Sequence, residues 1–179
     1  FIRMNLDHLS ETQWSDSTTI KIQIHNMAKV ANESYELIRA MLAMLHSGNS
    51  ADPLSLFTRY AEQVAERSSF QIDITSQRKP NQLSPLQIRQ LFFIFREALS
   101  NIEKYADADR VSGEFLWEER VLTMVISDNG RGFDPHTVQT VGHYGLKFMR
   151  ERAEQLKGSF SVQSAPGQGT TITVVMPCE

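Results

Sequence analysis

The stretch that most constrains the fold is an apolar alternating run, Val121-Leu122-Thr123-Met124-Val125-Ile126, which leads into Ser127-Asp128-Asn129-Gly130-Arg131-Gly132. Branched and apolar residues in this order predict a strand, because they suit a pleated, half-buried surface. A strand that ends in an acid and two glycines can direct one carboxylate into a pocket while backbone approaches a ligand closely. The same residues are also good turn formers, so an ordinary surface turn is the alternative for this stretch taken alone.

Composition and charge narrow the class of protein. The chain has 179 residues, of which 41% are hydrophobic and 22% charged, as in soluble globular proteins. This length allows one ordinary domain plus an appendage. A net charge of -3 argues against a general affinity for nucleic acid, which needs a basic surface. Cys178 is the single cysteine, which excludes an internal disulfide framework and favours a reducing cytosol.

The first 47 residues predict a helical hairpin without a core of its own. Phe1 to Leu9 has near-helical spacing, and a second segment repeats apolar residues at steps of three, four or seven: Ile20, Ile24, Met27, Val30, Ala31, Leu37, Ile38, Met41, Leu42 and Leu45. A second copy would bury this stripe in a coiled coil or four-helix bundle. Packing on its own domain is the alternative. Ser47 to Pro53 is the clearest linker, so the predicted units are 1–47 and 53–179.

The second unit predicts a mixture of helices and strands. Helices are expected from Pro53 through Val64, over Leu86–Tyr105 after Ser84-Pro85, and over Gly145–Leu156 with Gly158 as the C-terminal stop. Strands are expected over Phe70–Ile74, Arg110–Trp117, Val121–Ser127, Phe160–Gln163 and Thr170–Met176, with loops over Ser76–Asn81 and Asp128–Tyr144 and a hairpin turn at Glu118-Glu119-Arg120. This order predicts an α+β sandwich.

Three polar residues of the helix over Leu86–Tyr105 stand at i, i+4 and i+7, and therefore on one stripe: Glu97, Asn101 and Lys104. Magnesium keeps most of its waters and takes few protein ligands, so the Asn101 oxygen is a plausible direct ligand. A lysine would act as a point charge on phosphate. The alternative is a solvated helix face with an incidental Glu/Lys pair.

The glycines after Asp128 have two interpretations. Gly142, Gly145, Gly167 and Gly169 are by default flexible spacers. Gly145, however, opens a predicted helix, and the free backbone N–H groups at such an N-terminus would attract phosphate.

Taken together and in order, four runs resemble the nucleotide-binding boxes of sensor histidine kinases. The N box, the G1 box, the G2 box with its helix, and the last glycine box correspond to Arg96–Ala106, Asp128–Phe133, Gly142–Leu146 with Met149–Ala153, and Gly167–Thr171. The resemblance covers 53–177. The G2 region is most similar to that of the bacterial nitrate/nitrite sensor kinases, whose partners are response regulators with helix-turn-helix output domains.

The resemblance implies a Bergerat-type fold, a mixed sheet with helices on one face, that binds ATP and Mg²⁺. It implies that Asp128 accepts a hydrogen bond from the adenine amino group and that Thr170 supports Asp128 through a hydroxyl or water. Asn101 would ligate magnesium, Lys104 would contact phosphate, and Glu97 would orient water or assist proton transfer. The other nucleotide-binding residues that it implies are Gly130, Gly132, Gly142, Tyr144, Gly145, Leu146 and Gly169.

Two features depart from the family pattern. Tyr105 stands where the family often has histidine, and the segment between Phe133 and Gly142 is short, so the nucleotide is expected to be loosely covered. By the same resemblance, the phosphoacceptor histidine would lie about three helical turns before Phe1. His8 is the less favoured alternative, because Leu9 follows it instead of an acid.

The sequence therefore predicts the catalytic core of a sensor histidine kinase, cytoplasmic and homodimeric through the hairpin. It would pass phosphate to a histidine and then to a response regulator, with a sensor and membrane anchor expected before Phe1. The alternatives are an ATP hydrolase or anti-sigma-type serine kinase of the same fold, and a dimerisation module with an idle pocket.

Overall fold

The computed structural model describes residues 53–78, 83–135 and 144–178. The chain divides into two compact units, Phe1–Ala51 and Asp52–Glu179, and every described residue belongs to the second. The predictions for the hairpin over 1–47, for its pairing into a dimer and for the linker lie outside the described residues. In the described ranges, no helix has the length and apolar character needed to cross a membrane.

The described elements follow the predicted order of helices and strands. They are α3 (Pro53–Arg67), β1 (Gln71–Gln77), α4 (Pro85–Asn101), the π-helical turn η1 (Ile102–Ala106), β2 (Arg110–Trp117), β3 (Val121–Asp128), α5 (Tyr144–Gln155), β4 (Ser159–Ser164) and β5 (Thr170–Pro177).

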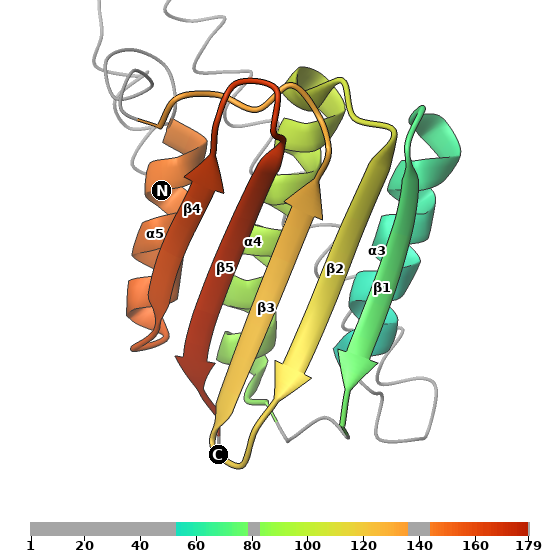
Figure 1. The fold of residues 1–179 in the computed structure, drawn as a ribbon. Coiled ribbons are helices and arrows are strands. Elements are labelled where there is room, and N and C mark those ends of the chain that lie inside the picture. The colour runs from blue at the N-terminus through green and yellow to red at the C-terminus, as the bar shows by residue number, and fades with distance from the viewer. Residues whose placement is uncertain (1–52, 79–82, 136–143, 179) are drawn as a thin grey trace, which may run out of the picture. The chain divides into compact units, whose positions relative to one another are not determined.

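The strands form one mixed sheet in the order β1-β2-β3-β5-β4 (Figure 1). β1 and β2 pair in parallel, with α4 in the crossover between them, and the other neighbouring strands are antiparallel. Figure 1 shows α3, α4 and α5 on one face of this sheet. The predicted α+β class, a mixed sheet with helices on one face, is confirmed.

The core lies between the sheet and the helices. Along β3 every second residue is buried (Leu122, Met124, Ile126 and Asp128), as expected for a strand with one face against helices. The ring of Phe57 lies 5.2 Å from that of Phe95 and 4.9 Å from that of Phe115, so aromatic packing joins α3, α4 and β2. Asp128 therefore stands on the helix-facing side of the sheet.

The N-terminus of α4 is fixed by local chemistry. Ser84 Oγ accepts from Gln87 N at 3.3 Å, and Gln87 Oε1 accepts from Ser84 N at 2.8 Å, which completes a capping box with Pro85 in the first turn. The predicted helix start at Ser84-Pro85 is confirmed. Gln87 Nε2 also donates to Pro177 O at 3.0 Å, which ties the helix start to the end of β5.

The C-terminal part of this helix differs from the prediction. The α-helix ends at Asn101 and continues as a π-helical turn to Ala106, where Asp107 adopts a left-handed conformation with φ 53°. The helix predicted over Leu86–Tyr105 is therefore present, but its last turn is π-helical instead of α-helical. Because a π turn contains more residues than an α turn, Lys104 is rotated away from the stripe that carries Glu97 and Asn101.

Two boundary predictions are also wrong. β1 continues through Ser76 and Gln77, which were expected to be loop, and Asp128 belongs to β3 rather than to the loop after it. The helix α5 stops before Gly158 as predicted: Lys157 is left-handed, with φ 56°, and Gly158 N donates to Ala153 O at 3.0 Å. A Cβ atom on Gly158 would also clash with the carbonyl oxygen of Val175.

Candidate functional site

Asp128, the last residue of β3, is one of two polar residues in the buried set of the described chain, and its exposed fraction is 9%. Its Oδ1 accepts from the backbone N–H of Gly130 at 2.8 Å. Burial raises the pKa of this carboxyl above the ordinary 3.8, while hydrogen bonds from the backbone amides of Gly130 and Thr170 oppose that rise. A carboxylate has about four acceptor positions, so acceptor capacity remains for a ligand donor.

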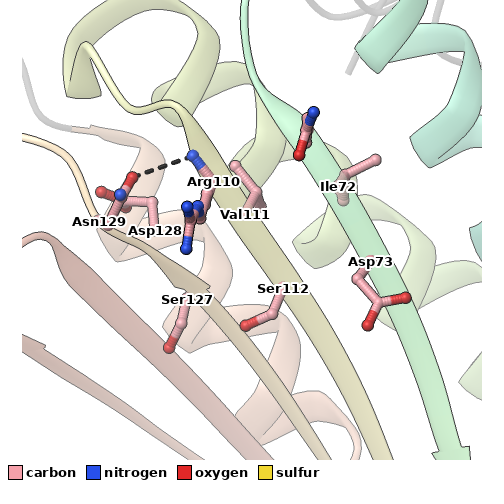
Figure 2. Close-up of a pocket in the computed structure, with 9 residues that line it drawn as sticks. Ile72, Asp73, Arg110, Val111, Ser112, Ser127, Asp128 and Asn129 are labelled. Atoms are coloured by element: carbon pink, nitrogen blue, oxygen red, sulfur yellow. Dashed lines mark hydrogen bonds between the residues drawn. The ribbon is translucent and has the colours of Figure 1, made fainter.

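The next residue, Asn129, anchors the loop after β3 to the start of β2. Its Oδ1 accepts from the backbone N–H groups of Arg110 at 3.0 Å and Asp109 at 3.2 Å, and its Nδ2 donates to Asp109 Oδ1 at 2.6 Å. Figure 2 shows the Asn129 side chain turned toward Arg110. The asparagine of the box is therefore a structural residue here, a role that its turn-forming character alone did not indicate.

Close packing surrounds the loop from Asp128 to Phe133. A Cβ atom on Gly130 would clash with the carbonyl oxygen of Ala106, and Arg131 N donates to that same oxygen at 2.7 Å. Gly132 has φ +57°, and a Cβ atom there would clash with the carbonyl oxygen of Ala165. The glycines let this loop fit between the end of η1 and the turn that joins β4 to β5.

Ser164, which the sequence did not single out, joins both glycine-containing loops. Its Oγ accepts from Phe133 N at 2.9 Å, donates to Gly169 O at 2.7 Å and lies 3.1 Å from Thr170 Oγ1. The Thr170 hydroxyl therefore has Ser164 as a partner, and the contact of Thr170 with the Asp128 carboxylate is through its backbone amide. A polar side chain at the end of an alternating strand was the only sequence signal for Ser164.

The metal and phosphate residues predicted on α4 lie beside the first turn of α5. A Cβ atom on Gly145 would stand 2.5 Å from Glu97 Oε1 and 3.5 Å from Asn101 Nδ2. Glu97 and Asn101 are both half-buried. Because Gly145 has no side chain, the N-terminal turn of α5 can approach the acid and the amide.

Glu103 and Lys104, which are neighbours in the π turn η1, have different surroundings. Glu103 is held by α3, where Arg67 Nε donates to its Oε1 at 3.0 Å and Arg67 Nη2 to its Oε2 at 3.1 Å. Lys104 and Tyr105 are exposed, Tyr105 to 56%. Leu146 is half-buried in the first turn of α5.

The predicted site residues thus fall into two groups on either side of η1. Glu97, Asn101 and Gly145 come together at the α4–α5 contact, and Asp128, Gly130, Gly132, Gly169 and Thr170 come together at the ends of β3 and β5. Tyr144 is the first residue of α5. The prediction for Gly142 lies outside the described residues.

A hollow of about 480 Å³ opens at the end of β1, β2 and β3 (Figure 2). Asp73, Ser112 and Ser127 are register neighbours across these strands and line it together with Asp128 and Asn129. No residue of α4 contributes to its lining. It is therefore separate from the space beside Glu97 and Asn101 that the sequence predicted for phosphate and metal.

Residues 87–179 match the model of the histidine kinase-, DNA gyrase B- and HSP90-like ATPase family. The chain belongs to this family. The matched segment runs from the first turn of α4 to the C-terminus and contains both groups of site residues. ATP as the ligand of this domain follows from the family.

Curated relatives narrow the class within this ATPase family. The chain is 30% identical over 158 residues to the signal transduction histidine-protein kinase/phosphatase DegS of Brevibacillus brevis, covering 87% of the chain and 40% of the relative. It is 31% identical to the sensor histidine kinase LiaS of Bacillus subtilis, covering 96% and 46%, and 26% identical to the nitrate/nitrite sensor protein NarQ of Escherichia coli, covering 97% and 31%. The chain thus spans less than half the length of these relatives. The predicted resemblance to sensor histidine kinases is confirmed.

Solved structures agree on the fold. The blue-light activated histidine kinase of Erythrobacter litoralis EL346 superposes with a TM-score of 0.68 at 16% identity, covering 98% of this chain and 56% of that one. The histidine kinase AdeS of Acinetobacter baumannii gives 0.60 at 13% identity, covering 98% and 92%.

Proposed function

We propose that this chain is the ATP-binding catalytic core of a two-component sensor histidine kinase. It would transfer the γ-phosphoryl group of ATP to a histidine on the dimerisation hairpin and from there to a response regulator. One observation carries the proposal: a buried carboxylate at the end of β3 and an acid–amide–glycine group at the α4–α5 contact flank the same π turn, through Ala106 on one side and Asn101 on the other.

The adenine end of the nucleotide is assigned to Asp128. Its carboxylate faces the helix layer, is held by the amide of Gly130, and retains acceptor positions for an exocyclic amino group. Gly130 and Gly132 leave no side chains between the loop and its neighbours, and Ser164 fixes the turn that carries Gly169. These features favour a rigid slot for a flat base.

The phosphate end is assigned to the α4–α5 contact. Among the described residues no group of three or more His, Cys, Asp or Glu side chains could hold a metal by itself. Mg²⁺ keeps several waters and uses phosphate oxygens as ligands, so it needs few protein ligands. Asn101 would supply an oxygen ligand, Glu97 would orient a water or take part in proton transfer, and bound Mg²⁺ would neutralise phosphate charge. Gly145 and the backbone N–H groups that follow it would face the phosphates, with Lys104 as a mobile cation.

Catalysis of phosphoryl transfer consists mainly of positioning the reactants and stabilising charge, since the protein has little covalent chemistry to perform. The γ-phosphorus would form a bond to a histidine nitrogen as its bond to the β–γ bridging oxygen breaks, and ADP would leave with that oxygen. The residues of this domain hold the donor in place, while the hairpin supplies the acceptor.

We further propose homodimerisation through the hairpin, a cytoplasmic kinase core anchored to the membrane by a preceding segment, and a response regulator of the helix-turn-helix output type. Nitrate/nitrite-type signalling is supported by the G2 run His143-Tyr144-Gly145-Leu146 and by the similarity to NarQ at 26% identity. DegS and LiaS, at 30% and 31%, support the broader class of sensor kinases.

The deciding experiment is a calorimetric titration with ATP, with and without Mg²⁺, followed by incubation with a separate dimerisation hairpin that carries a phosphoacceptor histidine. Tight, magnesium-dependent binding and labelling of that histidine from γ-labelled ATP are expected. Absence of binding would mean an idle dimerisation module. Binding with phosphate release but without labelled histidine would mean a hydrolase, and label on serine would mean an anti-sigma-type kinase.

A further inference from the structure

A partly buried polar network connects α4 to α5 away from the predicted ligands. Gln90 is buried, with an exposed fraction of 6%. Its Oε1 accepts from Arg152 Nη1 at 2.8 Å, and its Nε2 donates to Gln155 Oε1 at 2.8 Å. Both ends of the Gln90 amide are therefore bonded to α5, which fixes the orientation of the amide as well as its position.

The guanidinium of Arg152 has a second partner on α4. It lies over the ring of Phe93, 4.3 Å from the ring centroid, one helical turn after Gln90. A planar cation held at its edge by an amide oxygen and at its face by a ring is restricted in both translation and rotation. Arg152 thus locks α5 to two successive turns of α4.

This network and the proposed phosphate site lie on the same face of α4 and on the same face of α5. On α4, Glu97 follows Gln90 by seven residues and Phe93 by four, so all three lie on one face. On α5, Arg152 follows Gly145 by seven residues, about 10 Å along the axis. Arg152 meets the N-terminal half of α4, whereas Gly145 meets Glu97 and Asn101 near its end, so the two helices run antiparallel in register.

Apolar contacts alone would not hold that register. Buried Met149, between Gly145 and Arg152 on the same face of α5, is a flexible side chain that tolerates small shifts. The hydrogen bonds of the Gln90 amide do not tolerate such shifts, because a shift would leave the buried amide without its partners.

We propose that Gln90 and Arg152 are positioning residues for the phosphate end of the nucleotide. They hold the first turn of α5 against Glu97 and Asn101 and leave the adenine end at Asp128 untouched. This inference rests on the proposed function, since it assigns a role within the proposed nucleotide site. It predicts that damage to the network separates triphosphate affinity from nucleoside affinity.

The test compares Gln90→Leu with Gln90→Glu in the whole chain, measuring Kd for ATP with Mg²⁺ and for adenosine. Leucine removes both hydrogen bonds, and glutamate keeps the acceptor for Arg152 while the Gln155 amide can turn to donate. Gln90→Leu should weaken ATP binding about tenfold, which corresponds to ~1.4 kcal/mol of binding free energy, with adenosine affinity unchanged. Gln90→Glu should stay within about twofold of the original chain for both ligands.

Each result of this test either supports or overturns the positioning role. An equal loss for ATP and adenosine in Gln90→Leu, or no loss for either, would overturn the positioning role. If Gln90→Leu does not fold, Arg152→Met gives the same comparison from the α5 side, with the same expected separation of the two affinities. Failure of the original chain to bind ATP at all would instead contradict the proposed function and is seen before any variant is made.

Discussion

The backbone amide of Gly130 donates a hydrogen bond to the carboxylate of Asp128 over 2.8 Å, so the residue that ends β3 is held by the loop that it begins. The backbone amides of Gly130 and Thr170 thereby use acceptor positions of this carboxylate within the protein, and a ligand must use those that remain. Changes at residue 128 that keep an oxygen for Gly130 should therefore alter binding without altering the fold.

Asp128→Asn is the sharpest such change. Asparagine can still accept from Gly130, but it replaces an anionic acceptor with a neutral amide, one end of which is a donor facing the adenine amino group. Nucleotide affinity should fall by about ten- to a hundredfold, as expected for losing the ~1.5–3 kcal/mol of a hydrogen bond to a charged group. Calorimetry with ADP measures the loss, and circular dichroism checks the fold.

Glu114→Gln is the matched control, because Glu114 carries an exposed carboxylate on the other face of the same sheet and does not line the hollow beside Asp128. It should leave the affinity within about twofold of the original. Equal affinities for the Asp128 variant and the original chain would refute the adenine assignment.

The pH dependence of binding follows from the same carboxyl. Burial raises the pKa of Asp128 above the ordinary value of 3.8. Adenine recognition needs the ionised form, so affinity for adenosine should decline on acidification while the pH is still above 3.8, and Asp128→Asn should lack this decline. Adenosine is the suitable ligand because it carries no phosphate that titrates. A midpoint at or below 3.8 would contradict the raised pKa.

Stability should respond to pH in the direction that linkage requires. A carboxyl whose pKa is raised in the folded state binds protons more readily there than in the unfolded chain, so its contribution is full below pH 3.8 and is lost as the pH rises through the folded value. At pH 7 the charged, buried Asp128 therefore destabilises the domain. Asp128→Asn should unfold at a urea midpoint equal to or higher than that of the original chain at pH 7, and this advantage should vanish in acid.

Much of the fold could be predicted because the signals are local. Alternation in Val121–Ile126, the Ser84-Pro85 helix start and the order of strands and helices each depend on residues close in sequence. The π turn after Asn101 could not be predicted in this way, because the carbonyl oxygen of its last residue, Ala106, accepts a hydrogen bond from Arg131 N in a distant loop. The spacing of apolar residues along the helix does not indicate that contact.

The site divides in the same way. Asp128, Glu97, Asn101 and Gly145 were predicted from residue type and order, and the structure places them around one π turn. Ser164 and the Gln90–Arg152 pair were missed, because their importance comes from partners on other elements. A serine at a strand end or a glutamine on a helix is unremarkable until the chain is folded.

Two asparagines of the site should behave differently when changed to alanine. Asn129 makes three side-chain hydrogen bonds to Asp109 and Arg110, so Asn129→Ala should lower the free energy of unfolding by about 1–3 kcal/mol. Asn101 is half-buried at the end of α4, where alanine is a better helix former, so Asn101→Ala should change stability by less than about 0.5 kcal/mol.

Binding should show the opposite pattern for the same pair. Asn101→Ala should remove most of the enhancement that Mg²⁺ gives to ATP binding, while adenosine affinity stays unchanged. Urea unfolding gives the stabilities, and ATP titrations with and without Mg²⁺ give the enhancement. Full magnesium dependence in Asn101→Ala would argue against this residue as a ligand.

The turn between β4 and β5 offers a test of why its glycines are needed. Gly167 and Gly169 both have positive φ, +80° and +68°, so alanine is strained at either position. At Gly167 a Cβ atom would meet nothing within 4 Å, whereas at Gly169 it would clash with the backbone carbonyl of Asp128. Gly167→Ala should therefore cost only the conformational term, about 1–2 kcal/mol of unfolding free energy. Gly169→Ala adds overpacking against backbone that cannot rotate away, so its cost should reach about 3 kcal/mol or more.

Because the displaced atoms belong to Asp128, Gly169→Ala should also weaken adenosine binding under conditions where the protein remains folded, and Gly167→Ala should not. Urea unfolding and adenosine titration of the two variants measure both effects, and equal costs for the two substitutions would show that the turn moves freely relative to β3.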